Sequence, residues 1–155
     1  MPADRPGPVI RRAGPGDAAA LSALVEAAYT HWVEVIGRRP TPMDDDYGAR
    51  CAAGQAWLLE EDDAPLGGIV IEDKKEHLFI YNVVVAPERQ HQGVGRALLR
   101  FAEEEARQRG YGEVGLRTSE GMARNVAIYK QYGYMVTERT PAGDFDRLAM
   151  TKRLD

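Results

Sequence analysis

The segment from Val83 to Arg109 constrains the fold more than any other part of the chain. It begins as an apolar strand, continues as a loop that ends in Gly93 and Gly95, and becomes an amphipathic helix. The first turn of a helix has backbone N–H groups without helical partners, and glycines let an anion approach the backbone closely. The segment therefore predicts a phosphate-binding turn. An ordinary strand-to-helix turn, in which the glycines serve only the geometry, would explain a bare Gly-x-Gly equally well.

Two other phosphate-binding motifs do not fit the spacing of these glycines. A dinucleotide-binding fingerprint needs a third glycine at position 98, where the chain has Leu98. A P-loop needs Gly-Lys-Ser/Thr after its first glycine, and no such sequence follows Gly93. Neither of these two nucleotide-binding classes is predicted.

The rest of the chain predicts a mixed α/β protein of short strands and amphipathic helices. Asp17 is expected to be the N-cap of a first long helix that reaches Trp32. The helix after Gly93 connects two strands, which can therefore run parallel. Further helices are expected at 44–53 and 122–132, an antiparallel meander at 56–60, 66–72 and 78–85, a closing hairpin at 134–139 and 145–153, and single strands at 9–13 and 114–118.

Length and charge exclude several classes of protein. The 155 residues predict one domain, residues 9–155, after a disordered lead of residues 1–8 that has no signal-like apolar core. A net charge of -4 argues against nucleic-acid binding. A single cysteine, Cys51, permits no internal disulfide and no cysteine metal cluster, so no metal site is predicted. No apolar run approaches the ~20 residues of a membrane span. A cytoplasmic protein without a membrane or nucleic-acid partner is expected.

Two stretches resemble the GNAT superfamily of N-acetyltransferases. Residues Gln90 to Gly95 are similar to its pyrophosphate-binding pattern, Gln/Arg-x-x-Gly-x-Gly/Ala. Residues Ile128 to Tyr134 resemble its Leu-Tyr-x-x-x-Gly-Phe segment, with Ile for Leu and Tyr for Phe, and the family's tyrosine corresponds to Tyr129. The order of the expected elements also matches, so the resemblance covers nearly the whole chain. It implies an α/β fold with a mixed, mostly antiparallel central sheet, helices on both faces, and a splay between the fourth and fifth strands.

The resemblance also implies a cofactor and the residues that bind it. Acetyl-CoA would pair its pantetheine amides with backbone groups of Val83 and Val85, and its pyrophosphate would meet the N–H groups from His91 to Gly95. Asn125 would face the cofactor arm. The cofactor-binding residues expected in this way are Val83, Val84, Val85, Gln90, His91, Gln92, Gly93, Val94, Gly95, Arg96 and Asn125.

By the same resemblance the chain is an acyltransferase that moves acetyl to a primary amine of a small molecule or peptide by direct attack, without an acyl-enzyme. Tyr129 would protonate the leaving thiolate, and the N–H of Val85 would stabilise the developing oxyanion. Taken without the resemblance, Tyr129 is an ordinary core aromatic. The alternative function is a non-catalytic acyl-CoA-binding or sensor module on the same fold. A homodimer is compatible with the sequence, which does not set the oligomeric state.

The acceptor site is expected near the loop from His31 to Tyr47, which mixes aromatic rings with carboxylates. That mixture favours a cationic amine with an apolar body over an anionic acceptor. Capping of a helix by its acidic residues and loop packing would explain the same composition. The general base is open among Tyr81, Asn82, His31, Glu34, Asp46 and water. The expected acceptor residues are Tyr29, His31, Trp32, Asp46, Tyr81 and Asn82.

Overall fold

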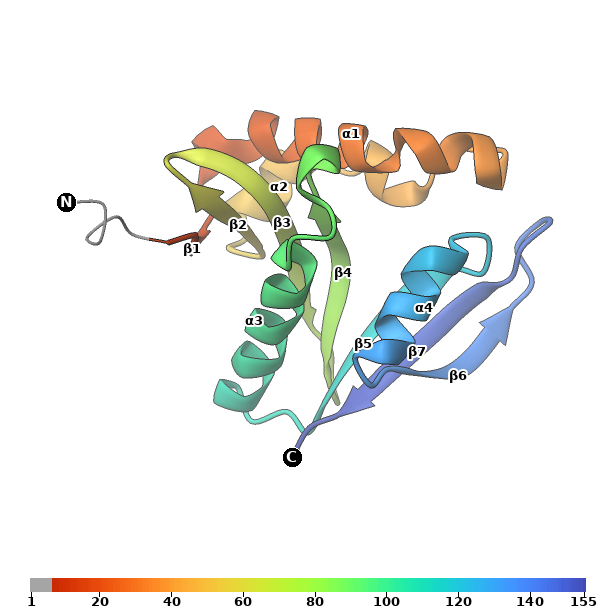
Figure 1. Ribbon diagram of the computed structural model, residues 1–155. Helices are drawn as coiled ribbons and strands as arrows, with labels where there is room; N and C mark the ends of the chain where they lie inside the picture. Colours follow the sequence, from red (N-terminus) through yellow and green to blue (C-terminus); the bar gives the residue numbers. More distant parts are fainter. Residues whose placement is uncertain (1–6) are drawn as a thin grey trace.

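Residues 7–155 are described by the computed structural model, and within them seven strands form one sheet in the order β1-β2-β3-β4-β5-β7-β6 (Figure 1). The paired strands are antiparallel except for β4 and β5, which run parallel. The strands are β1 (Val9–Arg12), β2 (Ala56–Glu61), β3 (Ala64–Asp73), β4 (Leu78–Val85), β5 (Glu113–Ser119), β6 (Met135–Thr140) and β7 (Arg147–Arg153). The α-helices are α1 (Ala18–Ile36), α2 (Tyr47–Ala52), α3 (Val94–Gln108) and α4 (Ala123–Gln131).

The helices cover both faces of the sheet, because side chains alternate along each strand. In β2, Trp57 and Leu59 pack with α3, whereas Ala56 and Leu58 pack with α1 and α2. The α4 side chain of Val126 joins the core on the α3 face. The expected mixed sheet with helices on both faces is confirmed.

Two glycines in β3 let helices approach the sheet closely. A Cβ on Gly67 would lie 2.9 Å from Cγ1 of Val94, the first residue of α3. A Cβ on Gly68 would lie 2.8 Å from Cδ1 of Leu21 in α1. Real Cβ atoms do not approach this closely, so these positions require glycine. The start of α3 is thereby held against the strand that pairs with β4.

Strand β4 carries a bulge and then leaves its parallel neighbour. Val70 lies opposite Asn82 and Ile71 opposite Ile80, so Tyr81 is an extra residue in β4. The pairing of β4 with β5 covers only Leu78 to Ile80, after which the two strands diverge (Figure 1). From Asn82 to Val85, β4 stays paired with β3 alone, which frees its other edge. The expected splay between the fourth and fifth strands is confirmed.

The expected elements all form, with shifts of a few residues at their ends. The side-chain role expected for Asp17 is wrong. Asp17 does precede α1, but its carboxylate accepts a hydrogen bond of 2.8 Å from the Gly14 N–H and pairs with Arg11 instead of capping α1. Residues 1–6 of the expected lead lie outside the described residues, and Gly7 and Pro8 are exposed coil. None of the helices within residues 7–155 combines the length and hydropathy needed to cross a membrane.

Candidate active site

Two cavities meet where β4 leaves β5. The loop cavity, about 550 Å³, lies against the turn that contains Gln90, His91 and Gly93. The splay cavity, about 370 Å³, is lined by Phe79 and Tyr81, among other residues. The two cavities share a wall, called here the junction, made by Tyr29, Val83, Met122, Asn125 and Tyr129.

The turn before α3 has the backbone of an anion site. His91 and Gly93 adopt positive φ angles of 66° and 85°, and α3 begins at Val94, so N–H groups of its first turn lack helical partners. A Cβ on Gly93 would meet no atom within 4 Å, and one on Gly95 would lie 3.5 Å from Val85 Cγ2. Steric crowding by neighbouring protein atoms therefore does not explain why either position is a glycine. Gly93 is needed for its φ, and Gly95 leaves open space at the helix start. This turn fits a phosphate group.

Cationic side chains border the same turn. Nη2 of Arg124, near the start of α4, lies 2.7 Å from Nε2 of His91. Because a guanidinium can only donate, that ring nitrogen of His91 accepts the hydrogen bond. Arg96, in the first turn of α3, also lines the loop cavity. The sequence interpretation missed Arg124, and its one signal is its place directly before Asn125.

The loop cavity gathers most of the residues expected to bind the cofactor. The side chains of two expected residues, whose expected contribution is a backbone N–H, lie outside the cavity. Gln92 binds the Glu88 carbonyl and Arg89 through its side-chain amide. Val94, the first residue of α3, is buried in the core. The expected residues that do line the cavity are Val83, Val84, Val85, Gln90, His91, Gly93, Gly95, Arg96 and Asn125.

Tyr129 stands at the junction with an unpaired hydroxyl. It lines both cavities, and its ring meets Tyr134 edge-on with the centroids 6.1 Å apart. Within residues 7–155 the hydroxyl has no hydrogen-bond partner. Burial raises the pKa of Tyr129 to about 12, so the hydroxyl keeps its proton at neutral pH. An unpaired, protonated hydroxyl in a cleft is available to a ligand.

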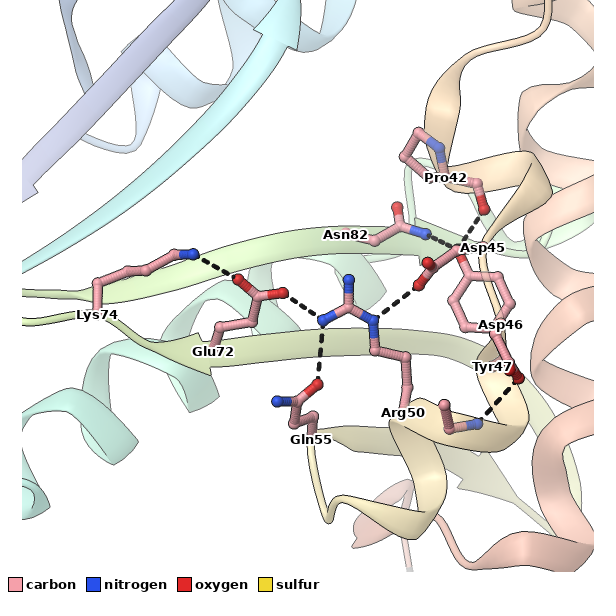
Figure 2. A network of polar contacts seen from close by, with 10 residues as sticks. Pro42, Asp45, Asp46, Tyr47, Arg50, Gln55, Glu72, Lys74 and Asn82 are labelled. Atoms are coloured by element: carbon pink, nitrogen blue, oxygen red, sulfur yellow. Dashed lines mark hydrogen bonds and ion pairs between the residues drawn. The ribbon is translucent and has the colours of Figure 1, made fainter.

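Asn82 is buried, and its amide links β4 to α1 and α2. Figure 2 shows the link to Tyr47 of α2. Its Oδ1 accepts a hydrogen bond of 2.7 Å from the Tyr29 hydroxyl of α1. Its Nδ2 donates 2.9 Å to the Tyr47 hydroxyl of α2, which donates in turn to the Pro42 carbonyl. Burial raises the pKa of Tyr29 well above its ordinary value. The amide therefore fixes the wall of the splay cavity and has its oxygen already engaged.

Arg50 holds a second polar network beside Asn82. Figure 2 shows its guanidinium between Asp45, Gln55 and Glu72, with a 2.7 Å contact to Asp45 Oδ2. The same guanidinium lies 4.0 Å above the Tyr81 ring. Burial favours the neutral form of Glu72, but hydrogen bonds from Lys74 and Arg50 outweigh it and lower the pKa of its carboxyl.

The residues expected to bind the acceptor lie in different places in the structure. Tyr29 lies at the junction, and Tyr81 and Asn82 line the splay cavity. His31 and Trp32, whose tilted rings have centroids 4.5 Å apart, line the loop cavity, on the side of the turn with Gly93. Asp46 is the N-cap of α2, where its Oδ1 accepts a hydrogen bond of 3.0 Å from the Ala49 N–H. This contact is the capping that the sequence also allowed, and Asp46 lines neither cavity.

The sequence interpretation missed the side chains that reach the splay cavity from strands far apart in the chain. Phe79 comes from β4, Arg117 from β5 and Arg147 from β7, and Phe145 precedes β7. No local motif marks them. Their common location follows only from the order of the strands in the sheet.

Comparison with known proteins places this geometry in a family. Residues 21–134 match the model of the acetyltransferase (GNAT) family. N-acetyltransferase 8B from Homo sapiens is 28% identical over 127 residues, which are 76% of this chain but only 55% of that protein, so the chain spans about half of that relative's length.

Solved structures give the same fold. PaiA N-acetyltransferase from Thermoplasma acidophilum, in complex with coenzyme A, aligns with a TM-score of 0.80 at 16% identity over 96% of this chain and 99% of that one. The ribosomal-protein-S18-alanine N-acetyltransferase from Escherichia coli aligns with a TM-score of 0.71 at 17% identity, over 95% and 94%. Because the family model spans well over half of the chain, the protein belongs to the GNAT acetyltransferase family.

Proposed function

We propose that the protein transfers an acetyl group from acetyl-CoA to a primary amine, with the acetyl-CoA in the loop cavity and the amine in the splay cavity. The observation that carries this proposal is the unpaired hydroxyl of Tyr129 at the junction of the two cavities. Tyr129 lines both cavities and its hydroxyl is protonated, so the hydroxyl can donate to a ligand bound there.

The residues of the loop cavity fit coenzyme A. The turn with His91 and Gly93 offers backbone N–H groups to the pyrophosphate, and Arg96 and Arg124 add positive charge. The free edge of β4 offers amide and carbonyl groups to an extended arm. When bound, acetyl-CoA supplies an activated acetyl thioester. The PaiA relative, which binds coenzyme A, supports this assignment.

Tyr129 is the proposed proton donor. As the amine nitrogen bonds to the acetyl carbon and the carbon–sulfur bond breaks, the Tyr129 hydroxyl would give its proton to the sulfur, and water would then return a proton to Tyr129. Because the pKa of Tyr129 is about 12, its hydroxyl is still protonated when the thiolate leaves. The role requires no covalent bond between the acetyl group and the protein.

The proton of the attacking amine goes to water in this proposal. Among the described residues that line the splay cavity there is no histidine, and the one carboxylate, Glu72, is already bound by Lys74 and Arg50. A carboxyl with a lowered pKa is a weak base. The amine is therefore expected to react as the free base that it forms in solution.

The proposal is tested by measuring thiol release from acetyl-CoA with a panel of primary amines, both small molecules and short peptides. Amine-dependent release together with N-acetylated product by mass spectrometry is the expected result. Binding of acetyl-CoA without release for any amine would instead establish the alternative, a non-catalytic acyl-CoA-binding module. Release that proceeds through an acetylated protein would contradict direct attack.

A further inference from the structure

We infer that the acceptor is a small amine that also carries an anionic group, a carboxylate or a phosphate, held by arginines of the splay cavity. This inference rests on the proposed function and names the class of its substrate. It differs from the cationic acceptor expected from the sequence.

The splay cavity is strongly cationic in a protein that is acidic as a whole. Among the described residues, its one carboxylate is that of Glu72, and the chain carries a net charge of -4. Five cations line the cavity, namely Arg38, Arg39, Lys74, Arg117 and Arg147. Concentration of one sign of charge in a cleft selects ligands of the opposite sign.

Three of these five cations have no carboxylate of their own. Lys74 pairs with Glu72 at 2.8 Å, and Arg39 pairs with carboxylates of α1 and the following loop. Within residues 7–155, no ion pair engages the remaining three, which are Arg38, Arg117 and Arg147. Their charges are available to a ligand.

The register of β5 and β7 brings two of the unpaired arginines together. Ser119 of β5 lies directly opposite Arg147 of β7, and Arg117 is two residues before Ser119. Residues opposite each other, or two apart on a strand, share one face of the sheet, so Arg117 and Arg147 are diagonal neighbours. Guanidinium groups in such an arrangement suit the planar oxygens of a carboxylate or the oxygens of a phosphate.

An aromatic ring lies beside these charges. The guanidinium carbon of Arg117 is 5.7 Å from the centroid of the Phe79 ring, and Lys74 Nζ is 5.3 Å from the same centroid. A cavity of about 370 Å³ is at the small end of ligand pockets. The combination suits a small molecule whose amine reaches Tyr129 while its anionic group stays at the arginines.

The acidic run that favoured a cationic acceptor is occupied by internal contacts. Asp44 pairs with Arg39 at 3.1 Å, and Asp45 pairs with Arg50 at 2.7 Å. Asp46 caps α2. Each of the three carboxylates thus has a partner within the protein, and none of them lines the splay cavity.

The test compares matched amines with and without an anionic group. The pairs are L-phenylalanine with phenethylamine, aminohexanoate with hexylamine, and phosphoethanolamine with ethanolamine, which vary the anion and its distance from the amine. The value of kcat/KM is calculated per free-base amine, because a carboxylate also changes the amine's pKa. In at least one pair, the anionic member should be preferred by about tenfold or more. The pair that shows the preference distinguishes carboxylate from phosphate.

Arg117→Gln and Arg147→Gln should each remove most of that preference by raising the acceptor KM, while the KM for acetyl-CoA stays unchanged. Arg153→Gln is the matched control, because Arg153 is exposed on the same face of β7 at its other end and lines neither cavity. It should keep the wild-type preference. A preference that survives in both test variants would overturn the role of the arginines.

The outcomes separate this inference from the proposed function. Thiol release with equal kcat/KM within every pair would overturn the inference and leave the transferase function intact. If no amine is acetylated, the melting temperature is measured with each pair of amines in the presence of coenzyme A. Stabilisation by the anionic members alone would support the inference, and no such stabilisation would overturn it. Failure of acetyl-CoA itself to shift the melting temperature would contradict the proposed function.

Discussion

The hydroxyl of Tyr29 donates a hydrogen bond of 2.7 Å to Oδ1 of Asn82 and so ties helix α1 to the bulged strand β4. Both residues line the splay cavity, and Tyr29 also faces the loop cavity. Asn82 occupies this position because the bulge at Tyr81 shifts the alternation of β4 by one residue. The bulge therefore accompanies the free edge of β4 and also fixes the wall of the splay cavity.

Asn82→Ala should destabilise the fold. The change leaves the buried Tyr29 hydroxyl without its acceptor and removes the donor to the Tyr47 hydroxyl. Unsatisfied buried polar groups cost about 1–3 kcal/mol. Urea denaturation should show a loss of this size, and Gln108→Ala, on the exposed face of α3, should show little change. Equal stability of the two variants would mean that the Asn82 network does not hold α1 in place.

Asp46→Ala should lower the stability of the fold and leave the KM values nearly unchanged. Loss of an N-cap side chain costs about 1 kcal/mol, and Asp46 caps α2 through the Ala49 N–H. Thermal denaturation should show this loss, while the KM values for acetyl-CoA and the amine stay within about twofold of wild type, a change of less than 0.5 kcal/mol. A raised acceptor KM with unchanged stability would restore the expectation that Asp46 binds the acceptor.

Gly95→Val should abolish stabilisation by acetyl-CoA. At about 100 times its dissociation constant a ligand adds about 2.7 kcal/mol to stability, which raises the melting temperature of a chain of this size by roughly 5–10 °C. A branched side chain would fill the open space at the start of α3, where the nearest protein atom is 3.5 Å from the position of a Cβ. Gly112→Val, in open space beyond the other end of α3, is the control that should keep the shift. A normal shift of the melting temperature in Gly95→Val would mean that the phosphate binds elsewhere.

The pH profile should follow the acceptor amine and not a protein base. As pH rises, the fraction of free-base amine increases, so kcat/KM should increase up to the pKa of the amine, about 8 for an α-amine and about 10 for an alkylamine. The pKa of Tyr129, raised by burial to about 12, keeps this acid protonated throughout that range, so no falling limb is expected below about pH 11. Profiles with two amines of different pKa decide the matter, because an identical rising limb for both would reveal a protein base.

Much of the fold could be predicted from the sequence, because the signals for it are local. Hydrophobic spacing and turn residues marked every strand and helix, and the turn with Gly93 and Gly95 marked the loop cavity. The surroundings of the splay cavity could not be predicted where partners are distant in sequence. The carboxylate of Asp45 is engaged by Arg50, and Arg117 and Arg147 become diagonal neighbours only through the register of β5 and β7. Composition shows which charges are present but not which of them are already paired.

The kinetics of Tyr129→Phe test the proposed chemistry most directly. The substitution deletes the unpaired hydroxyl and preserves the ring that packs against Tyr134. Loss of a general acid costs ~10²-fold or more in rate, so kcat should fall by about that factor while the dissociation constant of acetyl-CoA changes by no more than a few-fold. Tyr111→Phe controls for the loss of a tyrosine hydroxyl and should retain wild-type kcat, because Tyr111 lines neither cavity and its hydroxyl bonds Asp73 and the Lys74 carbonyl. An unchanged kcat in Tyr129→Phe, with the chemical step shown to limit the rate, would contradict the role of Tyr129 and leave it a packed aromatic residue.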